Sequence, residues 1–184
     1  MKTIPKNIKL ETKRLVLKPL WNTNPKTMQK QANNFTIANF IGPDFHHPYK
    51  LKNATGFIQS SKDNWNKKGK EWVFAIFTKE NNIYIGNIGI KYDEINNTIS
   101  NLGYWIGEDF WGNGYMSEAV EEICKYSFKI LKVRKIIAKV FSPNKASQKV
   151  LIKSGFEIEG ILKKSHILKD KKIVDEIVFG KFSK

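Results

Sequence analysis

The segment from Gly103 to Ala119 restricts the fold of this 184-residue chain more than any other part of its sequence. An apolar run over residues 103–107 leads into a turn that contains Gly112 and Gly114, and an amphipathic pattern follows at once. Glycines let backbone N–H groups converge on an anion, and the first turn of a helix adds unpaired N–H groups and the positive end of the helix dipole. The segment therefore predicts a strand, a glycine loop and a helix that together seat a phosphate group.

The spacing of this loop excludes two familiar phosphate-binding motifs. A P-loop requires Gly-Lys-Ser/Thr, whereas Tyr115 and Met116 follow Gly114 here. A dinucleotide-binding fingerprint requires a third glycine where this chain has Ser117. An ordinary strand-to-helix turn is the alternative for an isolated glycine pair, so the rest of the chain must decide.

Length and composition predict a single domain over residues 1–184. Hydrophobic residues make up 41% of the chain, which excludes a disordered protein. No apolar run approaches the roughly 20 residues that cross a bilayer, so we expect no membrane partner. The N-terminus has no apolar stretch of a secretory signal, and the single Cys124 has no cysteine partner for a disulfide or a zinc site. These features favour a cytoplasmic protein.

The net charge of +15 is carried almost entirely by lysine, since Arg14 and Arg134 are the only arginines. A positive field attracts nucleic acids, acidic proteins and polyanionic cofactors alike. Arginine supplies most bidentate contacts to phosphates and bases, so its scarcity argues against a specific nucleic-acid partner. The charge either serves an anionic partner or reflects the composition bias of an AT-rich genome.

The hydrophobic pattern predicts an α/β (α+β) fold with a mixed, mostly antiparallel sheet of about seven strands, flanked by helices. Apolar runs predict strands over residues 14–20, 72–77, 83–90, 99–107, 135–141, 156–161 and 173–182. Apolar spacings of three and four predict helices over residues 25–40, 53–67, 116–131 and 144–153. Gly155 stands where the end of the last helix favours a positive φ.

Three blocks of the sequence resemble the GNAT N-acetyltransferases, and most closely the branch of the RimJ and RimL ribosomal-protein N-terminal acetyltransferases. The run from Gly103 to Ala119 is similar to the acetyl-CoA motif of that family. Residues 144–156 have the branch's Asn-x-x-Ser-x-x-x-Leu-x-x-x-Gly-Phe spacing, and residues 11–17 resemble its opening strand. The blocks occur in the family's order and extend over nearly the whole chain.

The resemblance implies acetyl-CoA as co-substrate and a central splay in the sheet. Amides over residues 112–117 would hold the CoA pyrophosphate, and the strand before them would lie along the pantetheine arm. Asn144 would hydrogen-bond near the thioester, a role compatible with capping its helix. The implied cofactor-binding residues are Trp105, Ile106, Gly107, Gly112, Asn113, Gly114, Tyr115, Met116, Ser117 and Asn144. Trp111 replaces the motif's Gln or Arg, which removes a side-chain contact to phosphate, and Met116 replaces a Gly or Ala.

Acetyl transfer from a thioester to an amine needs a neutral amine, an oxyanion stabiliser and a proton for the leaving thiolate. Backbone N–H groups around Gly107 are the expected oxyanion donors. Many GNAT enzymes use a tyrosine of the short helix as the acid, but this chain has Leu151 there. The resemblance therefore makes Ser147 the candidate acid; a serine that bonds only its own helix is the alternative.

The expected base is His166, which stands where the RimL-like proteins have a glutamate. A histidine with a pKa of about 6.5 can accept the ammonium proton through water. The change also fits a different substrate or the lack of a dedicated base. Glu108, at the end of the strand before the loop, is the second candidate, with a solvated turn residue as its alternative.

The sequence thus predicts an acetyl-CoA-dependent N-acetyltransferase that acts on a primary amine by direct transfer in a ternary complex. The expected acceptor is a protein or peptide α-amino group, as on a ribosomal protein; a drug, polyamine or metabolite amine is the alternative. A CoA-binding sensor without catalysis is the rival from another class. We expect no metal, because no cluster of His, Cys, Asp and Glu has ligand spacing. Cys124 is expected to pack, His46 and His47 to lie at the surface or a pocket wall, and a homodimer is left open.

Overall fold

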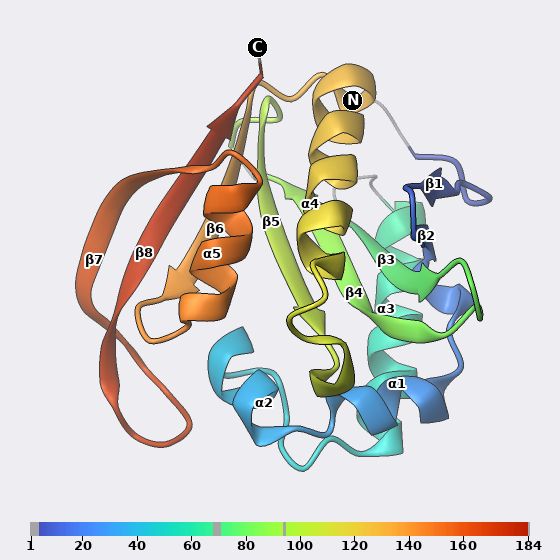
Figure 1. Cartoon of the computed structure of the whole chain (residues 1–184), viewed down its shortest axis with the longest axis horizontal. Helices are drawn as coiled ribbons and strands as arrows, with labels where there is room; N and C mark the ends of the chain where they lie inside the picture. Colours follow the sequence, from blue (N-terminus) through green and yellow to red (C-terminus); the bar gives the residue numbers. More distant parts are fainter. Residues whose placement is uncertain (1–3, 68–70, 94, 184) are drawn as a thin grey trace.

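One eight-stranded sheet forms the centre of the computed structural model, which describes residues 4–67, 71–93 and 95–183 (Figure 1). The strands are β1 (Leu10–Glu11), β2 (Leu15–Pro19), β3 (Glu71–Thr78), β4 (Tyr84–Tyr92), β5 (Ile99–Ile106), β6 (Lys135–Phe141), β7 (Glu157–Ile167) and β8 (Ile173–Phe182). Their order in the sheet is β1-β2-β3-β4-β5-β6-β8-β7, and β5 with β6 is the one parallel pair among the described strands. The predicted mixed, mostly antiparallel sheet is confirmed, and the two-residue β1 raises the predicted seven strands to eight.

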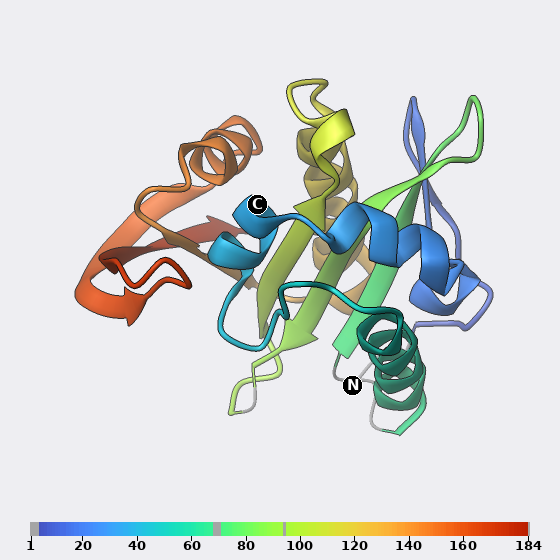
Figure 2. The same cartoon turned by 90° about the horizontal axis from the view of Figure 1, so that it is seen from below.

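Within the described residues, five α-helices flank this sheet. They are α1 (Pro25–Ala32), α2 (Phe35–Ile41), α3 (Leu51–Lys67), α4 (Tyr115–Tyr126) and α5 (Lys145–Lys153). Helices α4 and α5 lie on one face and α3 on the other, while α1 and α2 cross the end of the sheet where β5 finishes (Figures 1 and 2). The single helix predicted over residues 25–40 is wrong: the chain breaks at Asn33, and Asn34 starts a new helix by accepting the Ile37 N–H with its side chain.

The two faces of the sheet bury separate hydrophobic clusters, as strand alternation requires. On β3, Phe74 and Ile76 join the cluster that contains the buried face of α4, whereas Val73 and Ala75 join the cluster beneath α1, α2 and α3. Helix α4 continues through one wider turn, Ser127–Leu131, so the predicted helix over residues 116–131 is confirmed as one helical segment. None of the described helices has the length and apolar character needed to cross a membrane.

The sheet opens at its centre, between β5 and β6. These strands pair only over Ile99–Asn101 and Lys135–Ile137, while β4 stays paired with β5 as far as Ile106. Beyond Asn101 one edge of β5 therefore has no partner among the described strands, and backbone groups on this edge that pair with no side chain can bind a ligand. The predicted central splay is confirmed.

Candidate functional site

The glycine loop has the backbone geometry that its sequence predicts. Gly112 and Gly114 both have φ of +75°, in the left-handed region that side chains with a Cβ rarely adopt. Gly114 precedes the first residue of α4 and makes no side-chain cap, so it adds no group that competes for the first-turn N–H groups of the helix. The loop and the start of α4 form a backbone donor site for an anion.

Arg14, the residue before β2, contacts this loop from outside. Its Nε donates to Glu118 Oε2 at 2.7 Å, its Nη1 donates to the Asn113 carbonyl at 3.0 Å, and its guanidinium lies 4.5 Å from the ring centroid of Tyr115. Burial by itself would raise the pKa of Glu118, but hydrogen bonds from Thr12 and Arg14 outweigh it and lower that pKa. The sequence did not predict this contact between Arg14 and the glycine loop. The feature that could have indicated it is the presence of an arginine in a chain whose other basic residues are almost all lysines.

A cleft of about 720 Å³, here called the β5/β6 cleft, begins at the glycine loop and follows the splay. Eight of the ten predicted cofactor residues line it: Trp105, Ile106, Gly112, Gly114, Tyr115, Met116, Ser117 and Asn144. Four lysines also line it, namely Lys139, Lys145, Lys149 and Lys153. Part of the high positive charge therefore surrounds a site whose backbone already suits an anion.

The other two predicted cofactor residues, Gly107 and Asn113, do not line the cleft. The Gly107 N–H donates to the Ile85 carbonyl at 2.8 Å, so it is not available as an oxyanion donor. Because backbone groups alternate between the two edges of a strand, the Ile106 N–H faces the unpaired edge instead. The Ile106 carbonyl on that edge accepts the Trp111 indole N–H at 2.8 Å, which gives Trp111 a structural contact.

Ser147 lies in the wall of the β5/β6 cleft, near the start of α5. Its N–H donates to Asn144 Oδ1 at 3.1 Å, so Asn144 caps the helix as predicted. The Ser147 Oγ lies 2.8 Å from the Tyr104 hydroxyl of β5, across the splay. Burial raises the pKa of Tyr104 to about 12, so the phenol keeps its proton at neutral pH. The sequence analysis did not predict Tyr104 as a site residue. Because side chains alternate along a strand, Tyr104 lies on the opposite face of β5 from Trp105.

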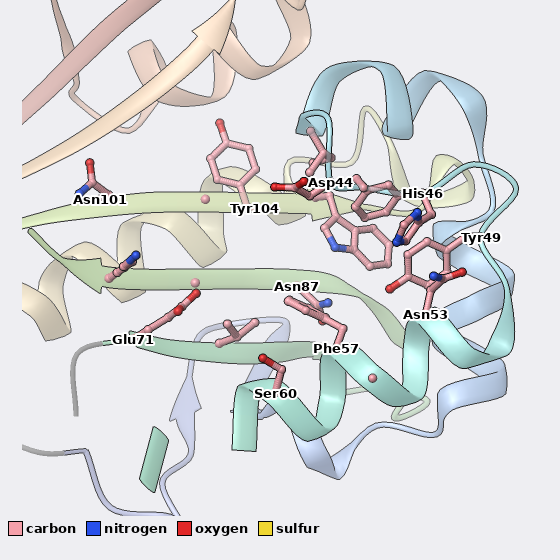
Figure 3. A pocket seen from close by; sticks show the side chains of 18 of the residues that line it. Asp44, His46, Tyr49, Asn53, Phe57, Ser60, Glu71, Asn87, Asn101 and Tyr104 are labelled. Atoms are coloured by element: carbon pink, nitrogen blue, oxygen red, sulfur yellow. The ribbon is translucent and has the colours of Figure 1, made fainter. Parts of the chain in front are cut away.

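A second cavity, also about 720 Å³, lies on the other side of β5 beneath α3 and is here called the α3 cavity (Figure 3). Both cavities are lined by Ile41 of α2 and by residues 102–105 of β5, so they meet at this stretch of the strand. Phe45 and His46 line the α3 cavity and Phe40 lines the cleft, while Phe35 packs against the His47 ring at 5.4 Å. The loop after α2 thus forms a pocket wall.

The two predicted bases lie outside both cavities. His166 is on β7, and its ring lies 4.4 Å from the ring of Phe141. The Glu108 carboxylate accepts a hydrogen bond from the side chain of Asn34, the residue that caps α2. Neither side chain lines the β5/β6 cleft or the α3 cavity, so the structure does not bring them to Ser147.

The remaining candidates show no reactive arrangement. Cys124 of α4 is buried, and burial raises the pKa of its thiol to about 12, which leaves little of the nucleophilic thiolate at neutral pH. Among the described residues, no group of three or more His, Cys, Asp or Glu side chains could hold a metal ion. The side chains that line the β5/β6 cleft thus offer hydroxyl, amide and lysine groups, whereas Asp44, His46 and Glu71 line the α3 cavity.

Comparison with known proteins identifies the family. A model of the acetyltransferase (GNAT) domain matches residues 14–157. An uncharacterized N-acetyltransferase of Bacillus subtilis, YoaA, is 28% identical over 84% of this chain and 85% of its own length. The ribosomal-protein-serine acetyltransferase of Escherichia coli is 29% identical over 62% of this chain and 68% of its own.

The solved structures agree on the fold. RimL, a ribosomal L7/L12 α-N-protein acetyltransferase crystallised with coenzyme A, superposes with a TM-score of 0.80 over 95% of this chain and 98% of its own, at 18% identity. Acetyl-CoA is the acetyl donor of this family, and the splay, the glycine loop and the lysines described above suit a CoA molecule. The chain belongs to the GNAT family of acetyltransferases.

Proposed function

We propose that this protein transfers the acetyl group of acetyl-CoA to a peptide or protein α-amino group, directly and within a ternary complex. The observation that carries the proposal is the meeting of the β5/β6 cleft and the α3 cavity at residues 102–105. A donor in one cavity and an amine in the other would face each other across this stretch, with the Tyr104 and Ser147 hydroxyls beside it. Such positioning is itself a large part of catalysis.

On the donor side, the glycine loop and the first turn of α4 would hold the pyrophosphate. Asn144 and the unpaired edge of β5 would hold the pantetheine arm and the thioester. The Ile106 N–H, on that edge, would donate to the thioester oxygen as negative charge develops there. Bound acetyl-CoA supplies the activated acetyl group, and every other task falls to these protein groups.

The leaving sulfur needs a proton or a strong hydrogen bond. Either hydroxyl can donate in the bond between Tyr104 and Ser147; with Tyr104 donating, Ser147 gives its proton to the sulfur as it takes one from Tyr104, and the proton that the amine loses restores Tyr104. A thiol has a pKa of about 8.5, so a weakly acidic hydroxyl is sufficient. We therefore assign the acid role to Ser147 and the positioning role to Tyr104.

Neither predicted base, His166 or Glu108, lines the two cavities, although Asp44, His46 and Glu71 line the α3 cavity; an α-amine depends less on such a base than a lysine or polyamine amine does. An α-amino group has a pKa of about 7.7 to 8.0, so a substantial fraction is already neutral at physiological pH. An alkyl amine with a pKa above about 10 depends far more on a dedicated base. The names of the RimL-type relatives, which modify ribosomal-protein N-termini, agree with this preference.

Thiol release from acetyl-CoA, measured across peptides, amino-acid amides, polyamines and aminoglycosides, tests the proposal. We expect the highest kcat/KM for amines next to a carbonyl. A preference for polyamines or drugs would favour the small-molecule alternative. Acetyl-CoA binding without turnover on any amine would favour a sensor, and no binding would refute the proposal.

A further inference from the structure

Asn87 of β4 is a buried polar side chain in the wall of the α3 cavity (Figure 3). It is 2% exposed. Its Oδ1 accepts the Tyr84 hydroxyl at 2.8 Å, and burial raises the pKa of Tyr84 well above its ordinary value, so this hydroxyl keeps its proton and can donate. Its Nδ2 has no hydrogen-bond partner among the residues that the structure describes. An amide donor is thus left unpaired at the cavity.

The residues directly opposite Asn87 offer this amide no acceptor side chain. Its cross-strand neighbours are Ala75 on β3 and Trp105 on β5, which have none. The next residues on the same face of the sheet, Gly89 and Gly103, have no side chain, and a Cβ on Gly103 would meet nothing within 4 Å. A buried donor of this kind needs a partner, and the cavity leaves space for one that is not protein.

The distance from Asn87 to the reaction centre fits one residue of a peptide. Asn87 lies directly opposite Trp105, which lines both cavities, and such cross-strand Cβ atoms are about 5 Å apart. In an amino acid the carbonyl oxygen lies only about 3 Å from the α-nitrogen. An amine at the junction therefore places its own carbonyl within reach of the Asn87 amide.

The walls beside Asn87 suit an apolar side chain. Phe45 and Tyr49 stack with their ring centroids 5.0 Å apart, and Phe57 of α3 lines the same cavity. Alkyl polyamines are largely protonated at neutral pH and have no carbonyl oxygen for the Asn87 amide. A small first residue such as serine or alanine would leave the aromatic walls without contact.

We propose that the acceptor is an α-amino carbonyl compound, a peptide or amino-acid amide with a large apolar first residue, and that the Asn87 side-chain amide donates to its carbonyl. This inference rests on the proposed function. It makes Asn87 a specificity residue, which distinguishes an α-amine from an alkyl amine of the same size.

The test compares phenylalanine amide with 2-phenylethylamine, which share the ring and the amine but differ in the carbonyl group. For the unmodified protein we expect kcat/KM, calculated from the concentration of the neutral amine, to be at least about 10-fold higher for the amide. In Asn87→Leu this ratio should fall to near one, as it should in Asn87→Asp, which keeps the Tyr84 bond but loses the N–H donors. The difference in pKa between the two amines cancels when the ratios are compared between proteins.

Gln59→Leu is the control, because this exposed amide of α3 lines neither cavity and bonds Asp63 one turn away. It should keep the preference for the amide. Acetyl-CoA affinity and thermal melting show whether each variant is folded. An equal use of the two amines by the unmodified protein, or a preference that survives in Asn87→Asp, overturns the inference while the proposed function stands. Turnover of no amine at all overturns both.

Discussion

The β5/β6 cleft and the α3 cavity meet on the same four residues of β5, yet they obtain their polar groups in different ways. In the cleft, the anion site consists of backbone N–H groups set by Gly112 and Gly114, with lysines around it. In the α3 cavity, the proposed recognition depends on one buried side chain, Asn87, and on aromatic walls. A site made by the backbone tolerates changes of most side chains, whereas a site made by side chains changes specificity with one substitution.

Gly114→Val should have the largest effect, because it changes the backbone on which the cleft depends. A β-branched residue at φ +75° forces the loop to rearrange or stores strain, and the rearranged loop no longer directs its N–H groups at one anion. We expect the dissociation constant of acetyl-CoA, measured by calorimetry, to rise by at least about 100-fold.

Gly155→Val is the matched control, since Gly155 has φ of +76° but lies after α5, away from the glycine loop. It imposes the same backbone strain and should lower the melting temperature similarly. Its acetyl-CoA affinity should fall far less. An equal loss of affinity in both variants would mean that strain, and not the anion site, explains the result for Gly114.

Ser147→Ala should come next, because it removes the hydroxyl at the junction of the two cavities. We expect kcat to fall about 100-fold and Tyr104→Phe to lower it about 10-fold, with little change in acetyl-CoA affinity. The double variant should be no slower than Ser147→Ala, because Tyr104 acts through Ser147. Steady-state kinetics over pH 6 to 9 measures this, and since the pKa of Tyr104 is about 12, its contribution should not vary over that range.

Tyr126→Phe serves as the control for the phenol, because Tyr126 is a half-buried residue of α4 outside both cavities. It should keep kcat within about twofold. Additive losses in the double variant of Ser147 and Tyr104 would show that the two hydroxyls act independently.

The order of these effects reflects how much of the site was visible in the sequence. Glycine positions predicted the loop, because positive φ is a property of a single residue, and the strands β6 and β8 were predicted with their observed bounds. Tyr104 was not predicted as a partner of Ser147, since the two residues are 43 positions apart and meet only after the sheet splays. Asn87 gave no local signal, because its importance depends on what its cross-strand neighbours lack.

Phe57→Ala tests the aromatic wall of the α3 cavity and should have a smaller effect. The side chain is 39% exposed, so its removal costs little stability but takes apolar surface from the acceptor. We expect KM for phenylalanine amide to rise about fivefold with kcat nearly constant. Phe35→Ala removes a ring of similar exposure (46%) that lines neither cavity and should leave KM unchanged. Equal changes in the two variants would contradict the assignment of this wall.

Arg14→Lys should have the smallest effect, because it keeps the positive charge and removes only the planar guanidinium group that contacts the glycine loop. A lysine cannot bond the Glu118 carboxylate and the Asn113 carbonyl at once while stacking on Tyr115. The loop is then less preorganised, and we expect acetyl-CoA to bind about threefold to fivefold more weakly.

Arg134→Lys is the control, since the only other arginine bonds Thr98, away from the glycine loop. It should leave acetyl-CoA affinity unchanged.

The pH dependence of stability adds a second test of Arg14→Lys. Because Glu118 has a lowered pKa in the folded protein, its stabilising contribution is present above its ordinary pKa of 4.5 and is lost as the pH falls through the folded value. Arg14→Lys weakens that shift, so the free energy of unfolding should fall less steeply on acidification than in the unmodified protein. If Arg14→Lys changes neither the pH dependence of the unfolding free energy nor the acetyl-CoA affinity, Arg14 does not stabilise the loop, and the glycines alone set its geometry.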